Sequence, residues 1–438
     1  MTPSWSGRGR LLPGTFAGSG LTRDLAELLA IPSVSTPVPN RAGLARAASW
    51  LGGRLAGMGC QKVQVGVSGG FPVVVAERRG TPGAPTILCY GHFDVVGAGT
   101  RSAWSCPPFA GTRRGSRMVG RGASDDKGPL IAQLRAAAAV RDLTWKFIYD
   151  GSEEIGSPGL PALLDQAGRW LRDVGTILVC DTEAAADGTP TLTVSIRGQV
   201  TVEVAVHRPG PVAHTGRHGG AVPDAALVVA RLVASLHGPD GEIQVAGLRD
   251  AYEPLPALGA SVGLPLSPKR LRALERVTVR PAVTVTELGV GDGRSRQGGV
   301  VPADARAVLD VRLVPGQGPG EAAGYIARHL AASLPAGVRI RIRRNHGSWP
   351  WRSRGPGGDA VEAFSEAVRG IWGVPPAMVR SGGTIPAVAL LSRVAPEAEV
   401  LLAGFSVPGN NAHGPDETAD LMQLQKAQRV ITGFARAL

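Results

Sequence analysis

Two patterns of apolar residues alternate along the N-terminal part of the chain. Segments with apolar residues three or four positions apart, or with an Ala-rich composition, predict helices; these are residues 21–30, 44–58, 129–140 and 160–167. Short runs rich in Val, Ile or aromatic residues predict strands; these are residues 72–77, 86–90, 145–149 and 176–180. Because strands alternate with helices, the pattern predicts an α/β layer fold with a mostly parallel sheet.

The pattern changes near residue 191, where long segments begin to alternate apolar and polar residues. This period is typical of strands with one solvent-exposed face, and the predicted strands are 191–196, 200–207, 283–288, 305–313 and 338–343. Helices are predicted at 225–236 and 320–333, and the Pro- and Gly-rich stretch 238–272 is expected to be irregular. Two helices on an antiparallel sheet indicate a compact α+β insert.

After residue 345 the first pattern returns, with a predicted helix at 360–371, a strand at 400–404 and a terminal helix at 421–437. We therefore predict a discontinuous α/β domain, residues 1–195 and 346–438, with helices on both faces of its sheet. An α+β domain of residues 196–345 interrupts it. The length of 438 residues also favours two domains, because single cores stop growing well below this size.

Composition excludes a membrane-spanning protein and predicts a cytoplasmic one. No apolar run approaches the roughly 18 residues that a membrane helix needs. Near the N-terminus, Arg8 and Arg10 precede a stretch that is interrupted by Pro and Gly, so it lacks the continuous apolar region of a secretory signal.

The net charge of +12 raises the question of an anionic partner. The densest basic stretch is 339–354, in which Arg339, Arg341 and Arg343 alternate with isoleucines. This period favours the solvated face of a strand. Steering of an anionic substrate is the second interpretation, and nucleic-acid contact is the least favoured.

Acidic residues and histidines gather where predicted strands give way to loops, which is where an open α/β sheet builds its site. There are five such segments: His92 with Asp94, Asp125 with Asp126, Glu153 with Glu154, Asp181 with Glu183, and His413 with Asp416 and Glu417. His92 is a candidate metal ligand, and Asp94 is placed to hydrogen-bond its other ring nitrogen. Each segment alone also fits a simpler interpretation: the Asp pair fits a capped helix start, and the Glu pair fits a solvated loop.

In order and spacing these segments resemble the site motifs of the M20 metallopeptidase family, in its carnosinase-like dipeptidase branch. The matching segments are GHFDVV at 91–96, GRGASDDKG at 120–128, GSEEIGS at 151–157, CDTE at 180–183 and AHGPDE at 412–417. Three others resemble further motifs of the family: HTGRHGG at 214–220, RLVP at 312–315 and SGGTIP at 381–386. The resemblance extends over residues 21–438.

The resemblance implies two divalent metal ions, Zn²⁺ with Mn²⁺ or Co²⁺ as alternatives, that activate a bridging water for cleavage of a peptide or amide bond. It assigns His92 and Asp181 to one ion, Glu154 and His413 to the other, and Asp125 to both. Glu153 becomes the general base and Asp94 the residue that orients His92.

Further roles implied by the resemblance concern the substrate and the assembly. His214 becomes the donor to the oxyanion, often supplied by the partner subunit of a homodimer formed through the lid, which is the inserted domain. The candidates for binding the substrate carboxylate are Arg312, Ser381, Gly382, Gly383 and Thr384. The discontinuous domain becomes the catalytic one.

Two positions depart from the family's pattern: Gly97 stands where Pro is usual after HxDVV, and Asp224 stands where the lid commonly has Asn. Asp181 and the SGGTIP segment favour a dipeptide substrate. The alternatives are an N-acyl amino acid deacylase on the same scaffold and, from another class, a catalytically silent binding protein.

Overall fold

The computed structural model describes residues 20–249, 268–291, 298–355 and 357–438. The chain divides into two compact units, which are described separately. The first comprises Met1–Val194, Ser353–Val379 and Ile385–Leu438, and the second comprises Ser195–Arg352 and Arg380–Thr384. The first unit is therefore built from three separate stretches of the chain, and the N-terminal tail before residue 20 lies outside the described residues.

Four parallel strands form the centre of the first unit's sheet. They are, in spatial order, β19 (Glu399–Ser406), β9 (Thr176–Glu183), β4 (Thr86–His92) and β8 (Thr144–Asp150). Antiparallel strands flank them: β3 (Phe71–Arg78) and β2 (Lys62–Ser68) beside β8, and β10 (Thr191–Ile196) beside β19. The predicted α/β class is confirmed, with the parallel arrangement confined to the central strands.

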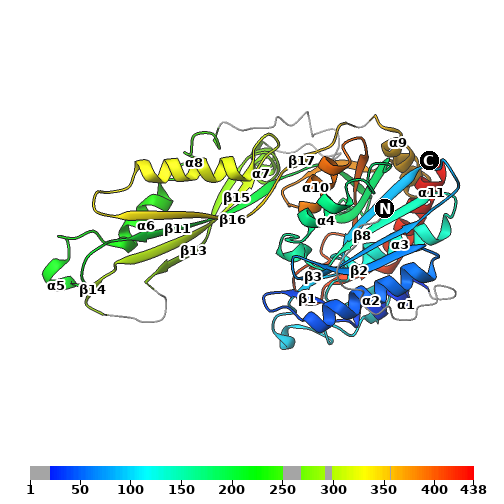
Figure 1. The fold of residues 1–438 in the computed structure, drawn as a ribbon, viewed down its shortest axis with the longest axis horizontal. Helices are drawn as coiled ribbons and strands as arrows, with labels where there is room; N and C mark the ends of the chain where they lie inside the picture. Colours follow the sequence, from blue (N-terminus) through cyan, green and yellow to red (C-terminus); the bar gives the residue numbers. More distant parts are fainter. Residues whose placement is uncertain (1–19, 250–267, 292–297, 356) are drawn as a thin grey trace. The chain divides into compact units, whose positions relative to one another are not determined.

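Both faces of this sheet are covered, which explains why its central strands are mostly apolar. In β4, Cys89 packs into the core cluster with Leu130 and Phe434, while the alternate residues Leu88 and Tyr90 are equally buried on the other face. Figure 1 shows α1 and α2 on one side of the sheet and α4 and α10 on the other. The helices are α1 (Leu21–Leu29), α2 (Arg41–Gly57), α3 (Lys127–Ala139), α4 (Leu160–Ala167), α9 (Asp359–Trp372), α10 (Pro386–Val394) and α11 (Leu421–Ala437).

Short strands outside the main sheet shape the loops of the first unit. They are β1 (Val34–Thr36) with β5 (Val95–Val96), and β20 (Thr418–Asp420) with β7 (Arg117–Val119) and β6 (Thr112–Arg114). Several elements of the first unit were not predicted, and the longest of them are β2, α10 and β18 (Ala377–Ser381), which pairs with β10. β2 did carry a strand signal, because Val63, Val65 and Val67 alternate with polar residues and Gly.

The second unit is a four-stranded antiparallel sheet with helices packed on one face. The strand order is β13 (Ala282–Val290), β15 (Asp304–Leu313), β11 (Gly198–His207) and β16 (Arg339–Ser348). Buried and part-exposed residues alternate along β11, and its buried residues share a core with α6 (Ala225–Ala234) and α8 (Pro319–Ala332). The predicted α+β arrangement is confirmed.

Part of the stretch 238–272 was wrongly expected to be irregular, because α7 (Pro268–Thr278) begins inside it. Pro suits the first turn of a helix, and the Leu-, Arg- and Glu-rich residues that follow favour helix. Residues 250–267 lie outside the described part of the chain. The remaining short elements of this unit are β12 (Ala213–His214), α5 (Thr215–His218), β14 (Val300–Val301) and β17 (Trp351–Arg352).

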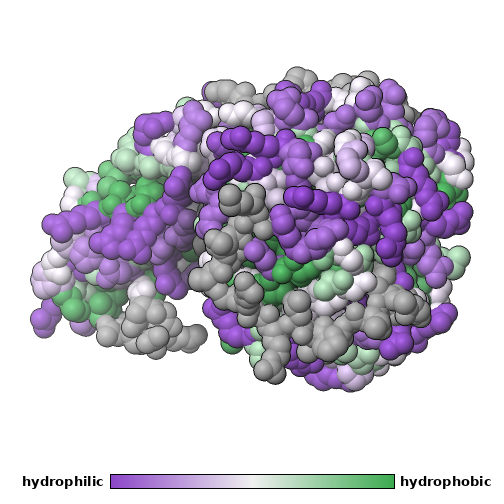
Figure 2. Space-filling view, turned by 45° about the vertical axis from the view of Figure 1, so that its right-hand side comes forward, coloured by the Kyte–Doolittle hydropathy of each residue, from purple (hydrophilic) through white to green (hydrophobic). Residues whose placement is uncertain are grey.

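The surface visible in Figure 2 is mostly hydrophilic, with apolar residues exposed in small groups. Among the described helices, none combines the length and the hydropathy of a membrane-spanning segment.

Candidate metal centre

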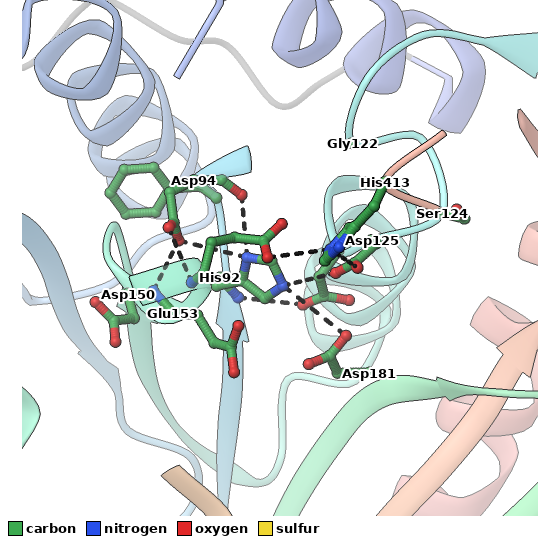
Figure 3. A network of polar contacts seen from close by, with 12 residues as sticks. His92, Asp94, Gly122, Ser124, Asp125, Asp150, Glu153, Asp181 and His413 are labelled. Carbon is green, nitrogen blue, oxygen red and sulfur yellow. Dashed lines mark hydrogen bonds and ion pairs between the residues drawn. The ribbon is translucent and has the colours of Figure 1, made fainter. Parts of the chain in front are cut away.

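The parallel strands of the first unit bring their carboxyl ends to one edge of the sheet, and polar residues occupy these ends. His92 is the last residue of β4, and Asp181 lies near the end of the adjacent strand β9. Glu153 and Glu154 follow β8 in the 3-10 turn η2 (Glu153–Ile155). Asp125 precedes α3, as Figure 3 shows. Chain topology alone therefore gathers these side chains.

Asp125 lies between two imidazoles. Its Oδ1 atom is 2.9 Å from Nε2 of His92, and its Oδ2 atom is 3.0 Å from Nε2 of His413. A further carboxylate lies near the same nitrogen of each ring: Glu154 Oε2 is 3.1 Å from His413 Nε2, and Asp181 Oδ1 is 3.9 Å from His92 Nε2. The five predicted ligands thus form two groups that share Asp125; Figure 3 shows Asp125 with His92, Asp181 and His413.

Asp126 was not predicted as a site residue, yet it belongs to the same cluster. Among the described residues, two triads have ligand atoms within 4.8 Å of one another: His92 with Asp126 and Asp181, and His92 with Asp125 and Glu154. Asp126 is fully buried, and its Oδ2 atom accepts a hydrogen bond of 3.1 Å from the backbone N–H of His92. Its Oδ1 atom is buried and has no hydrogen-bond partner in the part of the chain that the structure describes. The pair of adjacent Asp residues was the signal that could have indicated this position.

The carboxylates of the cluster outnumber its basic groups. Burial raises the pKa of Asp126 and Asp181 well above the ordinary range, and neighbouring carboxylates raise both further. Burial also raises the pKa of Glu153. In contrast, hydrogen bonds from His413 and His92 outweigh burial at Asp125 and hold its pKa below the usual value.

The pKa values of the two histidines are also raised, which for an imidazole favours the charged form. Hydrogen bonds to Asp125 and Glu154 raise the pKa of His413 to about 10. At His92 burial lowers the pKa, but hydrogen bonds to Asp125 and Asp94 outweigh it, so the pKa is raised well above the usual value. The arrangement therefore stabilises positive charge at this position. Nitrogen and oxygen donors of this kind suit Zn²⁺, Mn²⁺ or Co²⁺, so the donor set fits a divalent cation.

Asp94 connects the β4 loop to the turn that carries the two glutamates. Its fully buried carboxylate accepts backbone N–H groups from Glu153 at 3.0 Å and from Glu154 at 3.2 Å, and the hydroxyl of Ser35 at 2.6 Å. The Nδ1 atom of His92 lies 3.0 Å from the backbone carbonyl of Asp94 and 3.4 Å from its Oδ1 atom. A carbonyl only accepts, so in the neutral ring Nδ1 carries the hydrogen and Nε2 presents its lone pair.

The loop that carries His413 has an unusual backbone. Asn411, His413 and Asp416 have φ values of 57°, 62° and 53°. Non-glycine residues rarely adopt this left-handed region, and such positions persist where surrounding contacts hold them. Asp416 supplies one such contact, because its Oδ1 atom accepts the N–H and the hydroxyl of Ser105 at 2.9 and 2.8 Å.

The remaining predicted residues belong to the second unit. Arg312 donates from Nε to Asp310 at 2.8 Å and from Nη1 to the hydroxyl of Thr384 at 3.1 Å. Ser381 Oγ accepts the N–H of Gly383 at 3.1 Å. Another residue, Arg197, was not predicted; it donates from Nε to the carbonyl of Gly382 at 3.1 Å. The structure thus brings Arg312 together with the segment 381–384.

His214 is an exposed residue at the end of β12, and its Nδ1 atom accepts the N–H of Gly216 at 3.0 Å. Asp224, one of the two departures from the family pattern, caps α6: its carboxylate accepts the N–H groups of Ala226 and Leu227. Asp and Asn serve equally well at this helix position. The other departure, Gly97, donates its N–H to Thr36 at 2.8 Å.

Comparison with known proteins adds independent evidence. A family model described as peptidase family M20/M25/M40 matches residues 88–437. The chain is 29% identical to a cysteinylglycine-S-conjugate dipeptidase of Corynebacterium striatum, over 92% of each chain. It is 28% identical to the human Beta-Ala-His dipeptidase, over 88% of this chain and 81% of the relative. The structure of human carnosine dipeptidase 1 has the same fold, with a TM-score of 0.79, 24% identity and 95% of both chains covered.

Proposed function

Because the chain belongs to peptidase family M20/M25/M40, as its motifs predicted, we propose that it hydrolyses the peptide bond of a dipeptide with the help of two divalent metal ions. The observation that carries this proposal is the position of Asp125, whose two oxygens face His92 at 2.9 Å and His413 at 3.0 Å. A carboxylate that faces two nitrogen ligands from its two oxygens suits a bridging position between two cations.

In this proposal His92 and Asp181 hold one ion, Glu154 and His413 hold the other, and Asp125 contributes to both. Zn²⁺ is the proposed ion, since the donors are imidazole and carboxylate. When bound, such ions polarise the scissile carbonyl and lower the pKa of a nearby water. Asp126 holds His92 in place, because its carboxylate accepts a hydrogen bond from the backbone N–H of His92.

Glu153 is the proposed general base. Its buried position raises the pKa of its carboxyl group, and a higher pKa makes a carboxylate a stronger base. Glu153 takes the proton of the attacking water and delivers it to the leaving amine. Asp94 holds the turn that carries Glu153, through the backbone N–H bond of 3.0 Å.

Residues of the second unit are proposed to bind the substrate. Arg312, whose guanidinium is a planar fork suited to carboxylates, is bonded to Thr384 at 3.1 Å. These two residues, with Ser381, Gly382 and Gly383, are the proposed site of the substrate's C-terminal carboxylate. His214 is the proposed donor to the developing oxyanion.

We also propose a homodimer formed through the second unit, so that His214 is supplied by the partner. Strand β13 lies at one edge of the sheet, and its residues Val285, Leu288 and Val290 are 41%, 56% and 48% exposed. An apolar edge strand is prone to pair with another chain. The opposite edge, β16, carries exposed arginines, which disfavour such pairing.

Hydrolysis of a mixed panel by the Zn²⁺-loaded protein tests the proposed activity. The panel contains dipeptides, including Cys-Gly and β-Ala-His, and N-acyl amino acids, with the Glu153→Gln variant run beside the wild type. We expect metal-dependent release of free amino acids from dipeptides by the wild type alone. Cleavage of the acyl compounds only would indicate a deacylase instead, and no turnover by folded, metal-bound protein would indicate a binding protein.

A further inference from the structure

Arg121 and Glu417 form a buried ion pair between two loops of the metal centre. Their side chains are 2% and 1% exposed, and Arg121 Nη1 lies 2.7 Å from Glu417 Oε2. Arg121 belongs to the loop that leads to Asp125, and Glu417 follows the loop that contains His413. Neither residue is a proposed metal ligand or general base, so the proposed function assigns no role to this ion pair.

The carboxylate of Glu417 organises the loop before Asp125. Its Oε2 atom accepts the backbone N–H of Gly122 at 2.8 Å. Its Oε1 atom accepts the backbone N–H of Ser124 at 2.9 Å, the Ser124 hydroxyl at 3.0 Å and the backbone N–H of Asp125 at 3.2 Å. One carboxylate therefore determines the path of the backbone up to the residue that faces both histidines.

Arg121 reaches the other loop. Its Nη2 atom donates a hydrogen bond of 2.9 Å to the backbone carbonyl of His413, and its guanidinium lies over the ring of Trp104, 5.3 Å from the ring centre. The backbone of His413 is left-handed, with a φ of 62°. A donor that holds the carbonyl of this residue restricts the direction in which its imidazole points.

A purely stabilising role does not explain this arrangement well. Buried ion pairs can often be replaced by apolar residues without loss of stability, since removing charges from water is costly. Arg121 Nε is also buried without a hydrogen-bond partner among the described residues. The bonds that the pair does make all converge on the backbones next to Asp125 and His413.

We propose that Arg121 and Glu417 are a positioning pair that sets the separation of Asp125 and His413. The inference rests on the proposed function. Of the three ligands of the ion held by Asp125, Glu154 and His413, two depend on the pair. Of the three ligands of the other ion, only Asp125 does. Disrupting the pair therefore weakens one metal site more than the other.

Zn²⁺ titration of the full-length protein tests this selectivity, with calorimetry for the affinities and elemental analysis for the stoichiometry. In Glu417→Gln we expect one of the two binding steps to weaken by about 10- to 100-fold, the usual effect of losing a residue that supports a ligand. We expect the other step to change by less than about threefold. His413→Asn identifies the affected step, and Arg121→Lys, which keeps the charge but not the fork, weakens the same step.

Arg54→Met is the matched control, because Arg54 is another buried arginine paired with a carboxylate, Asp24, at 3.2 Å. It lowers thermal stability and leaves both binding steps unchanged. Ser124→Ala removes only the hydroxyl that donates to Glu417; it provides a mild variant if Glu417→Gln does not fold, and it weakens the same step slightly.

Two results would overturn the proposal: wild-type affinities at both steps in folded Glu417→Gln, or equal weakening of both steps. If Glu417→Gln does not fold, unchanged affinities in Ser124→Ala and Arg121→Lys would overturn it as well. A wild-type protein that binds fewer than two Zn²⁺ ions would instead refute the proposed function, and the positioning role with it. That failure is visible before any variant is measured.

Discussion

The backbone N–H of Glu153 donates a hydrogen bond of 3.0 Å to the carboxylate of Asp94, so the proposed base is held by a residue of the neighbouring strand's loop. The same carboxylate accepts the N–H of Glu154. Asp94 was expected to orient His92, but of the oxygens of Asp94 the backbone carbonyl, at 3.0 Å, lies nearer to Nδ1 of that ring than the carboxylate does, at 3.4 Å. The side chain of Asp94 therefore positions the two glutamates at least as directly as it positions the histidine.

Replacing Asp94 with Asn tests this arrangement. The amide group keeps one acceptor and places an NH₂ group against a backbone N–H, so the turn that carries Glu153 shifts. We expect kcat on a cleaved dipeptide to fall by about 10- to 100-fold, with two metal ions still bound. Ser35→Ala, which removes one hydrogen bond to Asp94, serves as the control and has a smaller effect. An unchanged kcat in Asp94→Asn would contradict the assignment.

Replacing Glu153 with Gln removes the proposed base and preserves its shape. Proton transfer by a positioned group contributes about 10²- to 10⁴-fold to rates, so kcat falls by that factor. Because Glu153 is not a proposed ligand, Zn²⁺ affinity stays within a few-fold of the wild type. Steady-state kinetics and calorimetry measure the two quantities, and the exposed residue Glu397 gives the matched control Glu397→Gln. Loss of metal together with activity would instead make Glu153 a ligand.

The pKa of His413 predicts how pH affects the stability of the metal-free protein. Its contacts raise this pKa from 6.5 to about 10. A group whose pKa is raised on folding contributes stability that is complete below its unfolded pKa and is lost as pH rises through its folded pKa. In the presence of a chelator, we expect Tm to fall between pH 6.5 and 10 by more in the wild type than in His413→Asn. Scanning calorimetry measures Tm, and parallel decreases would show that His413 does not contribute.

Asp224, which stands where the family commonly has Asn, is the N-cap of α6, and this position predicts how its replacement changes stability. Its carboxylate accepts N–H groups of Ala226 and Leu227, and loss of such a cap costs about 1 kcal/mol. We expect Asp224→Ala to lower the free energy of unfolding by that amount in denaturant titrations. Asp224→Asn restores the family's usual residue and changes stability by only a few tenths of a kcal/mol, since both residues cap well. A larger loss in the Asn variant would point to a separate role for the charge.

The exposed apolar residues of the edge strand β13 predict which substitutions weaken self-association. Lys in place of Leu288 or Val290 puts charge on an apolar edge, which disfavours pairing. We expect these variants to shift the protein from dimer to monomer in light scattering coupled to size exclusion. Val277→Lys is the control, because Val277 is 54% exposed on α7 rather than on β13. A wild-type monomer, or dimers unaffected by both variants, would refute the proposed interface.

The sequence by itself determined where the central strands lie and what stands at their ends. The apolar runs of β4, β8 and β9 were predictable because strands buried on both faces contain few polar residues. His92 and Glu153 were predictable for the same reason, since polar residues that directly follow such runs lie at the sheet edge where sites form. The order of the motifs was sufficient to identify the family.

Only the tertiary structure decided how neighbouring residues divide their tasks. The resemblance assigned a role to Asp125 alone, and only the structure shows that Asp125 faces two imidazoles while Asp126 is buried against the backbone of His92. Arg121 and Glu417 meet across 296 positions, which no local pattern could indicate. The physical reason is that periodicity and turn chemistry depend on residues close in sequence, whereas the direction of a side chain depends on contacts that exist only once distant loops have packed together.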